Sequence, residues 1–169
     1  NLKTLTISLY NRPKYTAQLF QSLNECHGVE EYNITIFCEP GNSEVIELAK
    51  NFRPDQAKLY INSARLGCNT NIYQCFKHGF SLSDYHIHLE DDTIPGKDCL
   101  KYFEWAKKYQ DDKDIFTVSG YVNSNNSTEH FMLKNDIIHG ASRRCWFTPW
   151  GWATWRDRWL EMRDWDFFG

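Results

Sequence analysis

The chain has 169 residues and a formal net charge of −3, and 24% of its residues are charged. This length predicts a single domain with a sizeable core, and no apolar run approaches the roughly 20 residues of a membrane-spanning helix. The mild acidity argues against a general nucleic-acid-binding protein, which usually carries a strong basic excess. The sequence begins with Asn and shows no charged-then-apolar leader, so we expect no signal peptide and a processed chain or excised piece.

The first half of the chain alternates between β-rich runs and helical apolar spacing. Strands are predicted at 2–10, 33–38, 57–61 and 84–89, and helices at 15–26, 43–52 and 69–79. Ser43 is the predicted N-cap of the second helix. This alternation predicts βαβ units and therefore an α/β fold with a mostly parallel sheet.

The second half is less regular. A helix is predicted at 97–110 and a strand at 115–119, then a polar loop at 123–128, and the run 131–138 allows further strands. A last helix is predicted at 151–162, with Trp152, Trp155 and Trp159 on one face. We interpret that face as core, with Asp157 and Glu161 solvated on the opposite face.

Three acids follow the fourth predicted strand directly: Glu90, Asp91 and Asp92, hereafter the acidic triplet. Adjacent carboxylates repel one another unless a positive group lies beside them. Hard oxygen ligands select Mg²⁺ or Mn²⁺, and Mg²⁺ takes only one or two carboxylates when phosphates complete its shell. A solvated acidic turn is the alternative, but ligands of open α/β sheets bind at the carboxyl ends of the strands.

The turn at residues 63–69 offers a second anion-binding candidate. Gly67 can take a positive φ, and the following helix begins with free N–H groups that suit an anion. Arg65 could hold a phosphate with two hydrogen bonds. The alternative is an ordinary turn with an exposed arginine.

Several segments together resemble the GT-A class of glycosyltransferases. HLEDDTIPGKDCLKYF resembles the Asp-x-Asp-type element of the family 2 enzymes, and is closer still to the Glu-Asp-Asp form in N-acetylglucosaminyltransferase I. TISLYNRPKYTAQLFQSL is similar to the family 2 first strand and helix, and TVSGYVNS to the strand after the metal motif. PWGWATWRDRW resembles a Trp-rich acceptor-side segment of bacterial members. The resemblance covers nearly the whole chain.

This resemblance implies a Rossmann-like GT-A sheet and transfer of a sugar from a nucleotide sugar, with a UDP-sugar expected, to a glycan or other hydroxyl acceptor. Residues 1–92 would be the nucleotide-sugar-binding half and 93–169 the acceptor-side half. Because family members often extend beyond this length, part of the acceptor site is expected to be missing. The implied cofactor is Mn²⁺ or Mg²⁺.

The resemblance also implies roles for single residues. Asp92 would ligate the metal, Asp91 would contact the ribose or diphosphate, and Glu90 would orient the sugar or ribose. The donor nucleotide would lie by Tyr10, Asn11, Arg12, Glu39 and Arg65. Glu39 would lie near the base, where family 2 enzymes usually have Asp.

An inverting transfer needs a carboxylate that accepts the proton of the acceptor hydroxyl. Asp164 and Asp166 follow the last predicted helix, and their apolar neighbours would raise a carboxyl pKa. N-acetylglucosaminyltransferase I and its relatives place an Asp after the Trp-rich region in this role. Asp164 is the preferred base. The alternative is that both residues are only polar residues near the chain end.

Six tryptophans lie between Trp146 and Trp165, and Trp146 and Trp150 precede the last helix in a loop. Loop aromatics suit a platform on which an acceptor sugar stacks. A non-catalytic carbohydrate-binding domain is therefore the second hypothesis. The five arginines and two acids of 141–163 give a net charge of +3 and would also suit single-stranded nucleic acid, but the acidic triplet would repel phosphate unless a metal were bound.

The remaining polar residues favour structural readings. The six cysteines contain no CxxC pair, so free thiols are preferred over a disulfide framework and a structural zinc site is not expected. His86 and His88 are interpreted as buried partners, and His139 as structural rather than metal-binding. The bacterial-like segment favours a cytoplasmic protein, while the glycosylation triplets at Asn33, Asn125 and Asn126 leave a lumenal enzyme open.

Overall fold

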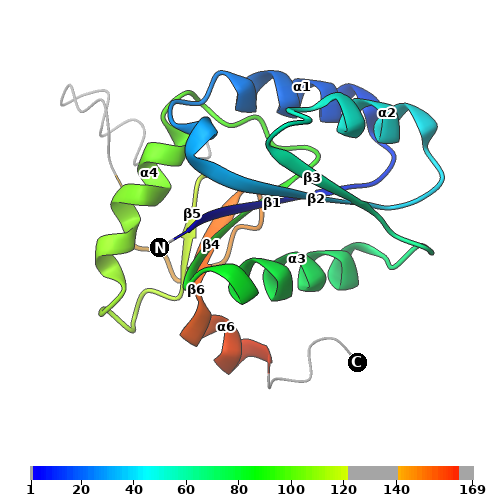
Figure 1. Ribbon diagram of the computed structural model, residues 1–169. Coiled ribbons are helices and arrows are strands. Elements are labelled where there is room, and N and C mark those ends of the chain that lie inside the picture. Colours follow the sequence, from blue (N-terminus) through cyan, green and yellow to red (C-terminus); the bar gives the residue numbers. More distant parts are fainter. Residues whose placement is uncertain (1, 122–140, 164–169) are drawn as a thin grey trace.

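The computed structural model describes residues 2–121 and 141–163, which build a six-stranded sheet with helices on both faces (Figure 1). The strand order is β3-β2-β1-β4-β6-β5. The strands are β1 Lys3–Leu9, β2 Tyr32–Cys38, β3 Ala57–Ile61, β4 Tyr85–Glu90, β5 Thr117–Ser119 and β6 Trp152–Trp155. Strands β1 to β4 pair in parallel, whereas β6 is antiparallel to both β4 and β5. The mostly parallel α/β sheet is confirmed.

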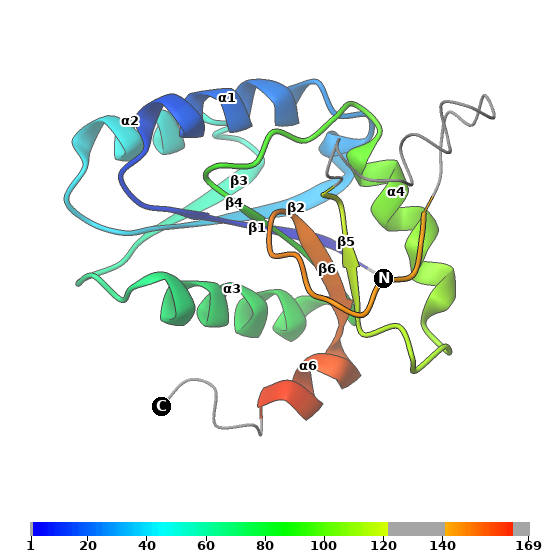
Figure 2. The ribbon, with the colours of Figure 1, turned by 180° about the vertical axis from the view of Figure 1, so that it is seen from behind.

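Helices form a layer on each side of this sheet. They are α1 Pro13–Asn24, α2 Ser43–Asn51, α3 Cys68–Leu82, α4 Cys99–Ala106 and α6 Arg156–Arg163, with 3-10 turns at Val29–Glu31 and Lys107–Tyr109. Figure 2 shows α1 and α2 on one face and α3 and α6 on the other. Residues of α1, α2 and α4 enter the large core, and α3 and α6 enclose a smaller aromatic one. Among the described helices, none is both long and apolar enough to cross a membrane.

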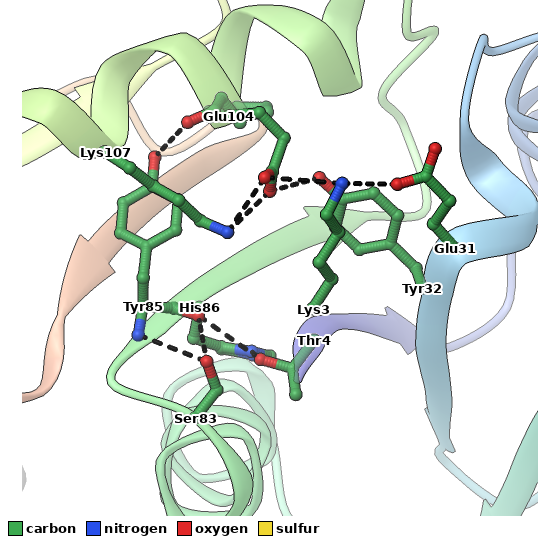
Figure 3. A network of polar contacts seen from close by, with 10 residues as sticks. Lys3, Thr4, Glu31, Tyr32, Ser83, Tyr85, His86, Glu104 and Lys107 are labelled. Carbon is green, nitrogen blue, oxygen red and sulfur yellow. Dashed lines mark hydrogen bonds and ion pairs between the residues drawn. The ribbon is translucent and has the colours of Figure 1, made fainter. Parts of the chain in front are cut away.

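Alternation along β4 sends two kinds of side chain to opposite faces. Ile87 and Leu89 belong to the large apolar core, while His86 and His88 are fully buried between the sheet and α3. The His86 ring nitrogens lie 2.9 Å from the Thr4 Oγ1 (Figure 3) and 2.8 Å from the Thr6 Oγ1. These hydroxyls satisfy the ring, as a buried polar group requires. The structural interpretation of both histidines is confirmed.

Close packing of α3 on β4 depends on Gly79. A Cβ added there would lie 2.3 Å from His86 Nδ1, well inside van der Waals contact. The helix can therefore approach the histidine only because this residue has no side chain.

The tryptophan segment differs from its prediction. Trp152–Trp155 is strand β6, and the helix begins only at Arg156. Trp152 therefore packs on Phe76 of α3, with ring centroids 4.2 Å apart, while Trp155 packs on Tyr85 on the other face of the sheet. The predicted single helical face is wrong, because pairing with β4 and β5 imposes a strand. The expected burial of the two rings and of Trp159 is confirmed.

Other element boundaries moved slightly. The N-cap of α2 is Asn42, not Ser43, and its side chain accepts a hydrogen bond from the Val45 N–H at 3.0 Å. The helix predicted at 97–110 is α4 followed by the 3-10 turn at Lys107–Tyr109. The candidate strands at 131–138 lie outside the described residues.

Charged groups at the amino ends of the strands pair with one another. Lys3, at the start of β1, forms ion pairs with Glu31 and Glu104 (Figure 3). Glu104 also accepts a hydrogen bond from the Tyr32 hydroxyl at 2.9 Å and pairs with Lys107. The charged side chains at this edge of the sheet therefore neutralise one another.

The six cysteines are free thiols, as expected. Cys26, Cys38 and Cys75 are buried, whereas Cys68 and Cys145 are exposed. Burial raises the pKa of each of the three buried thiols, so we expect these thiols to be unreactive.

Candidate functional site

The carboxyl ends of β1, β2 and β4 meet at one edge of the sheet. The register pairs Leu9 with Cys38 and Ser8 with Glu90. The segments that follow these strands therefore lie beside one another, and Arg12 donates hydrogen bonds to the carboxylates of Asp91 and Asp92. Two of the predicted donor-site segments, residues 10–12 and the acidic triplet, are brought together.

Arg12 is the cation beside the acidic triplet. It is the N-cap residue of α1, directly before Pro13, and its side chain is half exposed. Its Nη1 donates to Asp92 Oδ2 at 2.6 Å and lies 3.4 Å from Asp91 Oδ1. The positive group that three adjacent acids require is therefore supplied, in part, by the chain itself.

Burial and mutual repulsion perturb the triplet. Burial raises the pKa of Glu90 to about 7, and the charges of Asp92 and Asp91 add to this effect while Arg12 opposes it. Burial also raises the pKa of Asp91, against the lowering effect of Arg12. One arginine therefore does not neutralise the three acids, and the edge keeps a capacity for further positive charge.

Asp92 is one of the carboxylates that Arg12 leaves incompletely satisfied. Its Oδ1 is buried and has no hydrogen-bond partner within the described part of the chain. A buried carboxylate oxygen without a partner costs free energy, so this arrangement of Asp92 is electrostatically incomplete. The described residues contain no group of three or more His, Cys, Asp or Glu side chains that could hold a metal ion. The donor set thus fits a hard cation held by one or two carboxylates and by phosphates, and does not fit an all-protein cage.

Glu39 follows β2 and is buried, but the structure gives it a role that the sequence did not predict. Its carboxylate accepts hydrogen bonds from the backbone N–H groups of Leu66 and Gly67, at 3.0 and 2.8 Å, and from the Asn62 amide at 3.2 Å. Glu39 therefore holds the turn before α3 against the end of β2. A contact of Glu39 with a base stays a prediction.

The turn held by Glu39 carries Arg65. The Arg65 guanidinium lies 4.6 Å from the centroid of the Tyr10 ring, in cation–π geometry. Gly67 has a φ of +81°, as predicted, and no side chain caps the N-terminus of α3 at this residue. Arg65 thus lies next to the residues 10–12, and its contact with a phosphate stays a prediction.

Cys68 also belongs to this edge, although the sequence did not point to it. The thiol of this first α3 residue has its pKa raised by burial and then by Glu90 and Asp91, with Arg12 acting in the opposite sense. The charges of the acidic triplet and of Arg12 therefore act on this exposed thiol. Its position directly after the turn at the end of β3 is the signal that could have found it.

The loop before β6 reaches the same edge, at Gly151, from the other half of the chain. Because β6 is antiparallel to β4, its first residues lie at the carboxyl end of β4, where a Cβ on Gly151 would be 3.3 Å from Leu89. Trp150 is 45% exposed and lies 5.0 Å from the Tyr121 ring, and Trp146 is 66% exposed. A contact of Trp146 and Trp150 with an acceptor sugar stays a prediction.

The predicted catalytic bases are not placed. Asp164 and Asp166 lie outside the described residues, as do His139, Asn125 and Asn126. Asn11 is exposed between Tyr10 and Arg12. Asp157 is half exposed and pairs with Lys113 and Arg158, which agrees with a surface role.

No protein-family model and no curated protein sequence matches the chain. Solved structures do. A mannosyltransferase from Pyrobaculum calidifontis in complex with GDP-Man and Mn²⁺ aligns with 96% of this chain at a TM-score of 0.68 and 15% identity. The chain has the GT-A glycosyltransferase fold.

Two other neighbours agree. TarS of S. aureus, residues 1–349 in complex with UDP-GlcNAc, aligns with 72% of this chain at a TM-score of 0.55 and 15% identity. The galactosyltransferase LgtC in complex with donor and acceptor sugar analogues aligns with 94% at 0.54 and 13%. The chain spans 46%, 37% and 59% of the lengths of these three structures. The expected resemblance to N-acetylglucosaminyltransferase I stays a prediction.

Proposed function

We propose that the protein is a glycosyltransferase that moves a sugar from a nucleotide-diphosphate sugar to a hydroxyl acceptor. The observation that carries the proposal is the acidic triplet, incompletely neutralised at the carboxyl end of β4 in a GT-A fold. Ligands of open α/β sheets bind at this edge. The neighbouring structures contain GDP-Man or UDP-GlcNAc, which supports a nucleotide sugar as the ligand class.

The donor diphosphate needs positive charge. Asp92 would hold a divalent cation, with Asp91 as a second carboxylate, and the Mn²⁺ of the mannosyltransferase structure supports this choice. Such an ion supplies counter-charge to the departing nucleotide diphosphate when it is bound. The guanidinium groups of Arg12 and Arg65 would add hydrogen bonds to phosphate oxygens. Glu90 would orient the sugar or ribose, beside Tyr10 and Asn11.

The acceptor would lie on the aromatic loop. Trp146 and Trp150 present exposed rings on which a sugar can stack, and the loop that carries them leads at Gly151 to the end of β4. For an inverting reaction, Asp164 or Asp166 would accept the proton of the acceptor hydroxyl. Asp164 is preferred because it follows α6 directly.

A second candidate is a carbohydrate-binding domain without catalysis. The exposed Trp146, Phe147 and Trp150 favour it, because such rings bind glycans without nucleotide or metal. This function makes no use of Asp92.

Thermal-shift measurements with UDP, GDP and dTDP, each with and without Mn²⁺, separate the two candidates. The transferase predicts stabilisation by one nucleotide that depends on Mn²⁺ and disappears in Asp92→Ala. Asp157→Ala is the matched control, because that carboxylate lies on the surface away from the triplet. Binding of a glycan without any nucleotide effect would support the second candidate, and unchanged nucleotide binding in Asp92→Ala would refute the metal assignment.

A further inference from the structure

Arg12 closes the one oxygen of Asp92 that another ligand could reach. Asp92 Oδ2 accepts the hydrogen bond from Arg12 Nη1 at 2.6 Å, and Asp92 Oδ1 is sealed from solvent. The same guanidinium covers Asp91, whose side chain is only 11% exposed. A cation that approaches Asp92 therefore meets Arg12 first.

The side chain of Arg12 can leave the acidic triplet while its backbone stays in place. Its backbone is fixed, because its carbonyl accepts the first hydrogen bond of α1, from the Thr16 N–H at 2.9 Å. Its side chain is half exposed, and its described hydrogen bonds go only to Asp91 and Asp92. The half-exposed guanidinium keeps contact with water, so Arg12 can leave the carboxylates without becoming a buried unpaired charge.

We propose that Arg12 is an exchangeable counter-ion: it occupies Asp92 in the free protein, leaves when a divalent cation binds, and then pairs with the donor diphosphate. This inference rests on the proposed function. It turns Arg12 from a fixed donor-binding residue into a coupling between metal and nucleotide. The triplet is never left without a positive neighbour, which would otherwise cost free energy through repulsion among buried carboxylates.

Exchange makes the two ligands cooperative. A cation that binds alone must break the Arg12–Asp92 ion pair, which weakens its apparent affinity. A diphosphate offers Arg12 a new partner, so the cation binds more tightly in its presence, and by linkage the diphosphate gains by the same factor. A fixed ion pair would add nothing to this coupling.

The first experiment measures Mn²⁺ binding without nucleotide by isothermal titration calorimetry. Arg12→Gln removes the competing cation and should bind Mn²⁺ at least threefold more tightly than wild type. Lys14→Gln is the matched control, because it removes an exposed positive charge of α1 two residues from Arg12. A general change in potential would act in both variants, so the control should change the affinity less than twofold.

The second experiment repeats the titration with saturating UDP, the nucleotide product expected from a UDP-sugar donor. UDP should tighten Mn²⁺ binding in wild type by a larger factor than in Arg12→Gln, in which only direct metal–phosphate contacts remain. Circular dichroism confirms that each variant is folded, and ¹⁵N-detected arginine side-chain NMR with Mg²⁺ follows the guanidinium directly. The Arg12 resonance should lose its ion-paired character with Mg²⁺ and change again with UDP.

The possible results separate the two levels of the proposal. The exchange is overturned if Arg12→Gln binds Mn²⁺ with equal or weaker affinity than wild type, or if UDP tightens Mn²⁺ binding by the same factor in both proteins. The proposed function would still stand in that case, provided that binding of Mn²⁺ and UDP depends on Asp92. Absence of Mn²⁺ binding in every variant, with and without UDP and GDP, overturns both. Tighter binding to the same extent in Arg12→Gln and in Lys14→Gln also overturns the exchange, because it shows a simple charge effect.

Discussion

Strand β4 carries two sets of buried polar residues that behave in opposite ways. In its middle, His86 and His88 find hydroxyl partners on β1, with nitrogen–oxygen distances of 2.8 to 3.3 Å. At its end, the acidic triplet leaves Asp92 Oδ1 without a partner and holds a Glu90 whose pKa is raised to about 7. Satisfied polar groups fix a fold, whereas unsatisfied groups at an accessible edge indicate a place for a ligand.

The largest expected effect on the histidine part of β4 comes from Gly79→Ala. The added Cβ would lie 2.3–2.4 Å from atoms of the His86 ring, which two hydroxyls hold in place. We expect a loss of about 3 kcal/mol in the free energy of unfolding, measured by urea denaturation. Gly96→Ala is the control, because nothing lies within 4 Å of its Cβ position; equal losses in the two variants would contradict the packing account.

The two buried histidines should also make the stability of the protein depend on pH. Burial lowers the pKa of His88 to about 3 and that of His86 well below its usual value, so both rings stay neutral in the folded protein. The unfolded chain binds these protons below about pH 6.5, so this stability is complete above that pH and is lost as the pH falls toward 3.

We expect each of the two histidines to contribute a slope of about 1.4 kcal/mol per pH unit below pH 6. Urea denaturation at several pH values between 7.5 and 5 measures the slope. His88→Gln should reduce it by the share of one proton, and an identical slope in this variant would show that the ring is not held neutral.

For the acidic triplet we expect the free energy of unfolding to change with pH in the opposite direction. The pKa of Glu90 is raised in the folded protein, so the ionised carboxylate destabilises the fold as the pH rises from about 4.5 to about 7. Glu90→Gln should therefore stabilise the metal-free protein by about 1 kcal/mol at pH 8, a value reduced for the partial exposure of the group. The gain should vanish below pH 4.5, as measured by thermal denaturation in EDTA; a gain independent of pH would point to packing instead.

Cys68 gives the mildest test, because it only reports what covers the site. Mn²⁺ with UDP should slow its alkylation by N-ethylmaleimide several-fold, since a nucleotide beside the triplet would shield the thiol. Mass spectrometry of the labelled peptides measures the rate, and exposed Cys145 in the same molecule serves as the control. Equal protection of both thiols would indicate a general conformational change and not a ligand at this edge.

Local pattern alone was sufficient for much of the fold and for the position of the triplet. The order from β1 to α4 follows from apolar alternation and helical spacing, which depend on neighbours in the sequence. The acids had to lie at a strand end, because Glu90 is the last residue of β4 and Asp91 and Asp92 follow it.

Contacts between distant residues decided the rest. Trp152–Trp155 has helical spacing but pairs as β6 with β4 and β5, and the backbone partners of Glu39 come from a turn 27 and 28 residues away. Arg12 meets Asp91 and Asp92 across 79 and 80 residues. Strand pairing and ion pairing act through space, so only the folded chain shows which partners they join.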